Sequence, residues 1–378
     1  MNKHSLHKVF LFLVCLVTGI YSCKSDPPAS KPISLSNIFP ADSISSYVVK
    51  YGEVTFSNPV KIWEIDLDSP PWLSTSYDIF WDLIQRTSEQ DLTVKNVLKA
   101  KLYRHKDKVK RPLVLLMHGG GYVKGHKDSE EMAKLCRRLA MRGYVAASVE
   151  YRMMNILTCS FIKAGYCGTQ DAKAALRYFY AHADALNIDK KNIFIGGISA
   201  GAINALHAGF LDPSEKIADK TDKLSNMYGG VNESGNEDYE MPVIAGIINI
   251  GGGVFSTEIL DNKIPLLNVC GEHDDIISPV CDLPFNNEMK TYNEAIAGFI
   301  GTFDDARSKK LLKDALMIDM CGGKEIHQFL LHRKSSSELI YLPGYGHQFM
   351  FSSNGNFSTK GSEVFEKISA FLFKNYKN

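Results

Sequence analysis

Apolar segments of strand length alternate with amphipathic segments of helix length from Val97 to the C-terminus. A continuous apolar run such as 112–117 (PLVLLM) is typical of a strand covered on both faces, whereas 129–142 has helical spacing. Strands and helices that alternate in this way form βαβ units, so we predict an α/β fold with a mainly parallel central sheet and helices on both faces. Further strands are expected at 98–103, 144–149, 192–198, 243–250, 264–269 and 339–342, and further helices at 170–186, 200–210 and 363–376.

Two stretches interrupt the alternation. Residues 212–241 are polar and rich in glycine and asparagine, which predicts a surface excursion. Residues 284–333 carry helical patterns between two strands and are interpreted as a helical insertion. In open α/β sheets ligands bind outside the carboxyl ends of the strands, so this insertion either caps a binding site there or only packs on the domain.

The N-terminus has the form of an export signal. Lys3 and Lys8 precede an apolar run at 9–20, which is too short to span a bilayer because a spanning helix needs about 20 residues. We interpret 1–22 as a signal peptide and 23–36, rich in proline, serine and lysine, as an extended tether. The sequence at 20–23 (IYSC) resembles a bacterial lipobox, which implies lipidation of Cys23 and anchoring in the cell envelope; cleavage followed by secretion is the alternative.

Composition restricts the class of partner. The net charge is +1 and no block of basic residues is present, which excludes a dedicated nucleic-acid-binding protein. With 45% hydrophobic and 22% charged residues the chain is an ordinary globular protein. No cysteine or histidine spacing is typical of a zinc site, so no metal is implied.

The cysteines suit an oxidising compartment, where disulfides persist. Two pairs are candidates, one closing a short loop and one a longer loop: Cys159 with Cys167, and Cys281 with Cys321. Spacing alone does not determine the connectivity. Cys136 and Cys270 lie in apolar segments and are expected to be buried thiols.

A G-x-S-x-G pentapeptide at 197–201 joins the expected strand 192–198 to the expected helix 200–210. A serine on such a sharp turn has a strained backbone and presents its hydroxyl above the sheet, where it can act as a nucleophile. Gly197 and Gly201 are then required because the strand and the helix approach too closely for side chains. The alternative is that Ser199 only caps the helix.

Three consecutive glycines follow the strand at 112–117, in the sequence His118-Gly119-Gly120-Gly121-Tyr122. Their unshielded N–H groups are suited to stabilising the oxyanion of an acyl-transfer intermediate. We assign this role to Gly120 and Gly121, together with the N–H of Ala200. A phosphate-binding loop is the alternative, but the spacing of the known phosphate motifs is missing.

An acid and a base follow two later strands. Asp274 and Asp275 follow the strand expected at 264–269, and His347 lies in a glycine-rich loop after 339–342. His347 would accept the proton of Ser199, and an aspartate would hold the imidazole in the required tautomer. We assign Asp274 to this role, with Asp275 as the alternative. A histidine base also predicts that activity falls at acid pH, because a protonated imidazole cannot accept a proton.

The chain order serine, aspartate, histidine resembles that of α/β-hydrolases. Together with the H-G-G-G motif at 118–121, it is similar to carboxylesterases of the hormone-sensitive-lipase-like and feruloyl/acetyl-xylan esterase groups. Glu150-Tyr151-Arg152 and Asp171 also correspond to family features. The resemblance covers about 97–376 and implies one catalytic domain over 37–378, with a cap insertion at 284–333.

The activity implied by this resemblance is hydrolysis of carboxylic esters through an acyl-enzyme, without a cofactor. The expected substrate is a small-molecule or polysaccharide ester, such as acetylated or feruloylated plant polysaccharide. A serine peptidase of the prolyl-oligopeptidase type has the same triad order, but 37–96 cannot build its propeller. A non-catalytic hydrolase-fold binding protein is the remaining alternative; such proteins typically lose the serine or the histidine.

Overall fold

The computed structural model describes residues 31–57, 93–122, 124–153, 161–212, 224–225, 228–236, 238–261, 264–282, 284 and 319–378. Residues 33–378 form one compact unit. The predicted signal peptide, Cys23 and most of the tether lie outside the described residues, so the export signal and the lipid anchor stay predictions. Most of the predicted insertion, 285–318, lies outside them as well.

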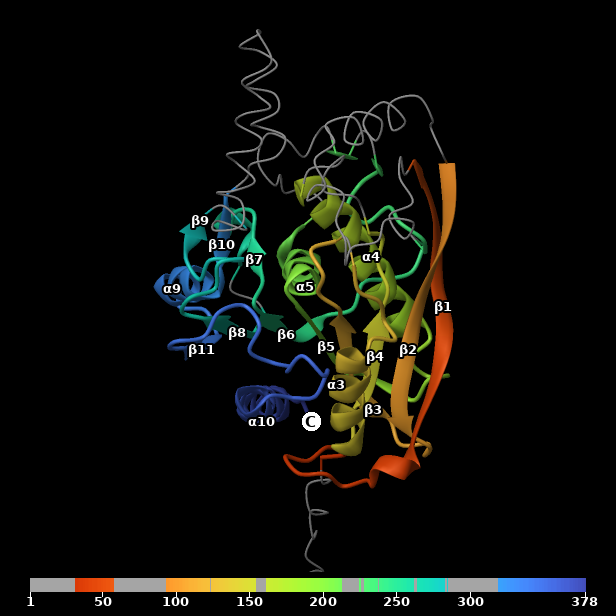
Figure 1. The fold of residues 1–378 in the computed structure, drawn as a ribbon. Helices are drawn as coiled ribbons and strands as arrows, with labels where there is room; N and C mark the ends of the chain where they lie inside the picture. The colour runs from red at the N-terminus through yellow and green to blue at the C-terminus, as the bar shows by residue number, and fades with distance from the viewer. Residues whose placement is uncertain are drawn as a thin grey trace, which may run out of the picture. The chain divides into compact units, whose positions relative to one another are not determined.

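An eight-stranded sheet forms the centre of this unit, in the order β1-β2-β4-β3-β5-β6-β8-β11 (Figure 1). The strands from β4 to β11 in this order are parallel, whereas β1–β2 and β2–β4 pair antiparallel. The mainly parallel sheet predicted from the alternation is therefore confirmed. The strands span Ile44–Ser57 (β1), Thr93–His105 (β2), Arg111–Met117 (β3), Val145–Val149 (β4), Ile188–Ile198 (β5), Ile244–Ile250 (β6), Leu266–Gly271 (β8) and Ser337–Leu342 (β11).

Helices cover both faces of the sheet (Figure 1). Within β3, Leu113 and Leu115 belong to one apolar core, and Val114 and Leu116 to the other, because successive side chains of a strand point to opposite faces. The first core includes α4 (Phe161–Ala181), α5 (Ala200–Phe210) and α9 (Gly323–His332); the second includes α3 (Glu130–Met141) and α10 (Thr359–Lys374). Two short 3-10 helices lie at Ala41–Ser43 and Thr257–Ile259.

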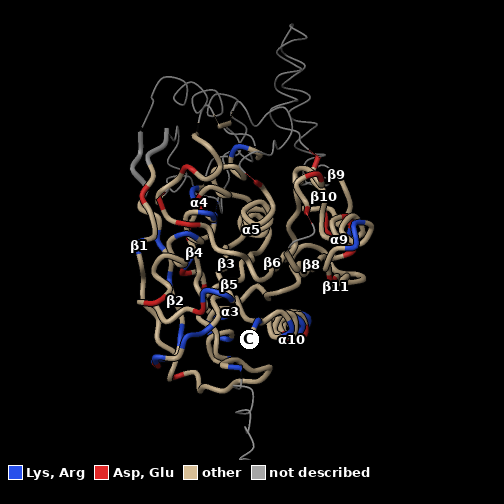
Figure 2. The backbone as a smooth tube through the Cα atoms, turned by 180° about the vertical axis from the view of Figure 1, so that it is seen from behind, with Lys and Arg blue, Asp and Glu red and all other residues tan. Residues whose placement is uncertain are grey.

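Charged residues are concentrated away from the centre of the sheet. Figure 2 shows them on the outer strands β1 and β2 and on the helices, whereas β4, β6 and β8 carry none. This distribution fits strands that are buried on both faces.

Two elements differ from the sequence prediction. No strand was expected at β1. The helix α4 begins at Phe161 instead of residue 170, because its first two turns also pack in the core.

The predicted surface excursion at 212–241 is exposed at 233, 235 and 238–240, but its described stretch 228–236 is also bound to α4. Buried side chains of α4 bind its backbone: Gln170 Nε2 donates to the carbonyls of Tyr228 and Gly230 at 2.9 Å, and Arg177 Nη2 donates to that of Ser234 at 2.6 Å. These hydrogen bonds satisfy backbone carbonyls of the loop, as a segment packed on a helix requires.

For the end of the predicted insertion at 284–333, the structure favours the second alternative, packing on the domain. Residues 319–333 contain β10 (Met320–Gly322) and α9, and α9 packs on β8 and β11. Ile326 and Leu330 belong to the same core as α4 and α5. The helix α9 is therefore part of the core, because its apolar face covers the sheet, whereas β10 pairs with β7 and β9, which follow the carboxyl ends of β6 and β8.

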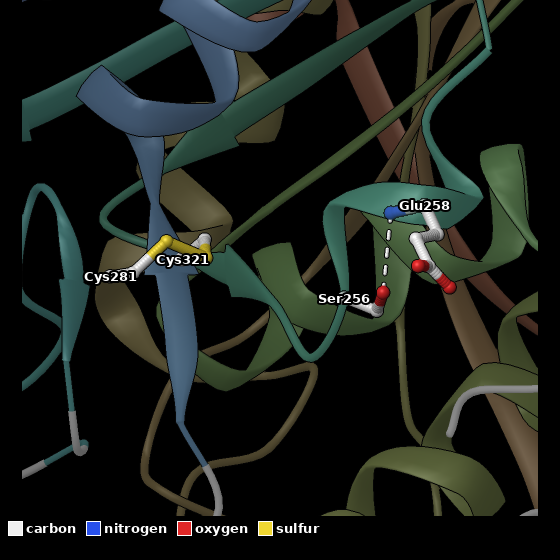
Figure 3. Close-up of a disulfide and its surroundings, with 4 residues drawn as sticks. All are labelled: Ser256, Glu258, Cys281 and Cys321. Carbon is white, nitrogen blue, oxygen red and sulfur yellow. Dashed lines mark hydrogen bonds between the residues drawn. A yellow bond between two sulfur atoms is a disulfide. The ribbon is translucent and has the colours of Figure 1, made fainter. Parts of the chain in front are cut away.

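A second, three-stranded sheet has the order β7-β10-β9, with β7 at Gly253–Val254 and β9 at Cys281–Asp282. A disulfide joins Cys281 in β9 to Cys321 in β10, close to the turn in which Ser256 Oγ accepts from Glu258 N–H (Figure 3). One of the two candidate disulfides is thus confirmed. Cys136 and Cys270 are buried thiols as expected.

The short loop expected from pairing of Cys159 and Cys167 is not formed. Cys167 is a free and fully buried thiol within α4, and Cys159 lies outside the described residues. A cysteine that faces the apolar core behaves as a small hydrophobic residue. Burial raises the pKa of the Cys167 thiol to about 12.

A buried ion pair joins the end of β4 to α4. Arg152 Nη2 lies 2.8 Å from Asp171 Oδ1, and both side chains are almost completely buried. We expect Asp171→Ala to lower the free energy of unfolding by about 3–5 kcal/mol, because the mutation leaves a buried guanidinium without its counter-ion. Urea unfolding measures this loss. Asp184→Ala, which breaks the exposed pair with Lys110, should leave the unfolding curve unchanged, and equal effects of the two variants would contradict the prediction.

Candidate active site

Ser199 occupies the turn between β5 and α5. Its backbone has φ 53° and ψ −121°, a conformation that is unfavourable for any residue other than glycine. Its side chain makes no capping hydrogen bond to α5, which argues against the reading of Ser199 as a helix cap. The hydroxyl is therefore held on a strained turn without a structural role in the helix.

The glycines on either side of Ser199 are required by close contacts. A Cβ atom at Gly197 would lie 2.3 Å from the carbonyl carbon of Gly201, and one at Gly201 would lie 2.3 Å from the carbonyl oxygen of Met117. Real Cβ atoms essentially never approach so closely. The start of α5 is thus packed directly on the ends of β5 and β3, and this packing produces the sharp turn.

His347 and Asp274 lie together at the carboxyl ends of β11 and β8. His347 Nδ1 donates to the Asp274 carboxylate, at 2.9 Å from Oδ1 and 2.8 Å from Oδ2. Oδ1 also accepts from the N–H groups of Ile276 and Ile277, at 3.1 and 2.9 Å. Among the described residues, Asp274 and not Asp275 pairs with His347. The proton on Nδ1 leaves Nε2 as the basic nitrogen of the ring.

The loops that carry the acid and the base are hydrogen-bonded to each other. Glu272 N–H donates to Leu342 O at 3.0 Å, His273 N–H donates to Tyr345 O at 2.8 Å, and Gly344 N–H donates to Glu272 Oε2 at 2.9 Å. A Cβ at Gly271 would collide with the carbonyl oxygens of this second loop at 2.3 Å. Since both loops are tied together on either side of the pair, Asp274 and His347 have a defined mutual orientation.

The turn after β6 brings this pair to Ser199. Ser199 N–H donates to Ile250 O at 2.8 Å. At the next residue, Gly251, a Cβ would lie 3.3 Å from His347 Cε1 and 3.7 Å from Asp274 Oδ2. All three candidate residues therefore surround one corner, Ile250-Gly251, at the carboxyl ends of neighbouring parallel strands.

The glycine-rich loop after β3 approaches the same corner. Gly119 lies against the turn, because a Cβ there would be 3.4 Å from Ser199 Cβ. Gly120 and Gly121 have φ of +117° and +60°, which only glycine adopts without strain. Ala200 is the first residue of α5, so its N–H has no partner within the helix. Gly119 thus brings the start of the glycine-rich loop beside Ser199, Ala200 follows Ser199 directly, and the oxyanion role of Gly120, Gly121 and Ala200 stays a prediction.

Buried side chains hold the start of this loop. Tyr151 donates its hydroxyl proton to His118 O at 2.8 Å and stacks on the His118 ring, and His118 Nδ1 donates to Gly119 O at 2.8 Å. Asn249 in β6 supports the opposite side of the corner by accepting from Gly252 N–H at 2.9 Å. Sequence reasoning assigned no role to Asn249; its polarity within an apolar strand was the available signal.

Two buried histidines near the site should make the fold sensitive to acid. Burial lowers the pKa of His118 and of His207 to about 4. His207 is held neutral: its Nδ1 donates to Ile203 O at 2.8 Å, while its Nε2 accepts from Phe255 N–H at 3.3 Å. Unfolded histidines titrate near pH 6.5, so the unfolded state takes up protons between about pH 6.5 and 4 and stability falls over that range.

We expect each of these histidines to remove up to roughly 3 kcal/mol of stability between pH 7 and 4. Urea unfolding of the wild type and of His207→Gln at several pH values isolates one of them. The stability advantage of the wild type should shrink as the pH falls below about 6.5, because only the wild type keeps a protonatable group at this position. An advantage that is independent of pH would contradict the buried neutral state of His207.

Two negative observations apply to the described residues alone. No group of three or more His, Cys, Asp or Glu side chains there is arranged to hold a metal ion. No helix in the described part of the chain has the length and apolarity needed to cross a membrane.

Comparisons with known proteins give one family match and several similar solved structures. Residues 101–246 match the family model BD-FAE, whereas a search of curated proteins gave no match. Esterase 2 from Thermogutta terrifontis is 17% identical with a TM-score of 0.47, covering 74% of this chain and 90% of that chain. EstE1, a carboxylesterase cloned from a metagenomic library, is 20% identical with a TM-score of 0.46, covering 75% and 86%. The resemblance stated from the motifs is confirmed for residues 101–246, which form a BD-FAE region within the mainly parallel α/β domain.

Proposed function

We propose that this chain is a serine carboxylesterase. The observation that carries the proposal is the corner Ile250-Gly251, which holds the uncapped Ser199 next to the hydrogen-bonded pair of His347 and Asp274. A serine, a histidine and an aspartate arranged in this way carry out nucleophilic acyl transfer in serine hydrolases. The match to the BD-FAE family over 101–246 supports the same reaction class.

The proposed reaction has two stages. Ser199 Oγ attacks the ester carbonyl while His347 Nε2 takes its proton, and Asp274 stabilises the imidazolium that forms. The N–H groups of Gly120, Gly121 and Ala200 stabilise the negative oxygen of the tetrahedral intermediate. The intermediate collapses to an acyl-enzyme as His347 returns the proton to the leaving alcohol. A water molecule, deprotonated by His347, then releases the acid and restores Ser199.

The test is hydrolysis of p-nitrophenyl acetate, butyrate and octanoate by the full-length chain. Saturable turnover supports the proposal, and the dependence on chain length reports the size of the acyl site. We propose small acyl groups, acetyl or feruloyl on plant polysaccharide, on the basis of the family resemblance. Acetylated xylan and methyl ferulate test this narrower statement. Absence of turnover on every ester would favour the peptidase or the non-catalytic alternative.

We also propose that the protein acts in the cell envelope, anchored through a lipid on Cys23. The signal-like segment 1–22 supports export, and so does the disulfide between Cys281 and Cys321, because disulfides are rare in the cytosol. Cys23→Ser should move the protein from the membrane fraction to the soluble fraction of the producing cell. Retention of the variant in the membrane would contradict the lipid anchor.

A further inference from the structure

We propose that Tyr122 is a positioning residue for the glycine-rich loop after β3, residues 118–122, called here the oxyanion loop. Its hydroxyl connects this loop to α5 through a hydrogen bond to Asn204. This inference rests on the proposed esterase function. Tyr122 follows Gly121 directly and is completely buried, so its side chain is not available to contact substrate. Its role must therefore act through the residues that it holds.

The backbone at Tyr122 supports this role. Gly120, Gly121 and Tyr122 form an uninterrupted run of positive φ values, of 117°, 60° and 67°. Glycine adopts such values freely, but a tyrosine in this region is strained and persists only where its surroundings hold it in place. The interactions of the Tyr122 side chain are therefore what maintains the end of the oxyanion loop in this conformation.

The side chain of Tyr122 provides that restraint. Its hydroxyl donates to Asn204 Oδ1 at 2.9 Å and also lies 3.3 Å from Ala200 O, both in the first turns of α5. Burial raises the pKa of Tyr122 well above its usual value, so the hydroxyl remains a donor. Its ring packs edge-on against Tyr151 and Phe161. The loop is thus connected to the same helix turn that supplies Ser199 and the Ala200 N–H.

The packing of α4 makes room for Asn204. A Cβ at Gly168 would lie 2.4 Å from Asn204 Oδ1. Glycine in the interior of a helix is destabilising relative to alanine, so a glycine at this place indicates a packing requirement. Asn204 is also fully buried in α5, where a polar group is costly unless it is bonded; its Oδ1 is bonded by Tyr122, whereas among the described residues its Nδ2 has no partner.

The two ends of the oxyanion loop are therefore held by two phenols. Tyr151 bonds the carbonyl of His118 at the start of the loop, and Tyr122 bonds α5 at its end. Oxyanion stabilisation depends on N–H groups that are already oriented before the charge develops. Loss of the bond at the end of the loop should therefore weaken transition-state stabilisation more than substrate binding.

The experiment compares Tyr122→Phe with Tyr144→Phe. Tyr144 is also fully buried, but among the described residues its hydroxyl has no hydrogen-bond partner, and it lies at the amino end of β4, whereas the site lies at the carboxyl ends of the parallel strands. Tyr122→Phe should lower kcat for p-nitrophenyl acetate about tenfold and change KM less than about twofold, since one positioning hydrogen bond is lost. Tyr144→Phe should leave kcat unchanged.

A thionoester separates positioning from general damage. Sulfur is a larger and weaker hydrogen-bond acceptor than oxygen, so hydrolysis of the C=S analogue gains less from the N–H groups of the loop. Tyr122→Phe should therefore lower kcat/KM more for the ester than for its thionoester, and Asn204→Ala should do the same. Combining the two mutations should add little, because both remove the same bond.

Other outcomes overturn the proposal. Equal losses on both substrates, or a Tyr122→Phe variant that behaves like Tyr144→Phe, would show that the hydroxyl does not position the loop. Thermal unfolding of each variant identifies a loss that comes only from instability. Ser199→Ala is measured in the same assay: if it abolishes turnover while Tyr122→Phe does not affect it, the proposed function stands and only this inference fails.

Discussion

Ser199→Ala should abolish ester hydrolysis, lowering kcat by at least about 10,000-fold, because removal of the nucleophile leaves only binding and the oxyanion N–H groups. The fold should survive. The Ser199 side chain makes no capping bond to α5, and alanine keeps the Cβ that the strained turn already accommodates. The rate of hydrolysis of p-nitrophenyl acetate and the free energy of unfolding in urea measure the two effects separately.

Ser335→Ala is the matched control for this variant. Ser335 lies between α9 and β11, and among the described residues its buried hydroxyl has no hydrogen-bond partner. This substitution removes the same oxygen far along the chain from the turn at Ser199 and should leave kcat unchanged. Full activity of Ser199→Ala, with Ser335→Ala equally active, would exclude the nucleophile assignment and with it the esterase proposal.

Asp274→Asn should lower kcat by roughly 1,000- to 10,000-fold with little change in KM. The carboxylate accepts the Nδ1 proton of His347, which leaves Nε2 basic. An amide can donate to Nδ1 instead, and this places the ring proton on Nε2, where the base is needed. The side-chain oxygen of asparagine can still accept from Ile276 and Ile277, so the loop should keep its conformation.

Asp275→Asn distinguishes the acid from its neighbour. It makes the same chemical change one residue along the chain, at a carboxylate that does not pair with His347, and kcat should change less than about twofold. The pair of variants is compared by kcat for p-nitrophenyl acetate at one pH. Similar losses in both variants, or a larger loss in Asp275→Asn, would contradict the assignment of Asp274.

The motifs around Ser199 were predictable because their requirements are local. A serine between an apolar strand and a helix, with a glycine two residues away on each side, requires a sharp turn, and all the residues that impose this requirement lie within one pentapeptide. The contacts at Gly197 and Gly201 are those that the pattern implied. The same holds for Gly120 and Gly121, whose positive φ values need glycine wherever the loop lies.

Other features could not be predicted because they depend on distant segments. The polar stretch at 228–236 is indistinguishable in composition from a surface loop, and only the docking of Gln170 and Arg177 shows that it is packed. A helical pattern at 323–332 likewise does not indicate whether it covers a sheet or caps a site. Cys167 was equally compatible with a disulfide and with a buried thiol.

The sequence by itself determined the α/β class, the turn at Ser199, the glycine loop and the chain order of the candidate triad, because each depends on periodicity or on residues close together in the chain. Only the tertiary structure decided between Asp274 and Asp275, since neighbouring residues on one loop point in different directions. It also revealed the partnership of Tyr122 and Asn204, 82 residues apart. Such contacts exist only after β3, α4 and α5 have packed, and no local pattern encodes them.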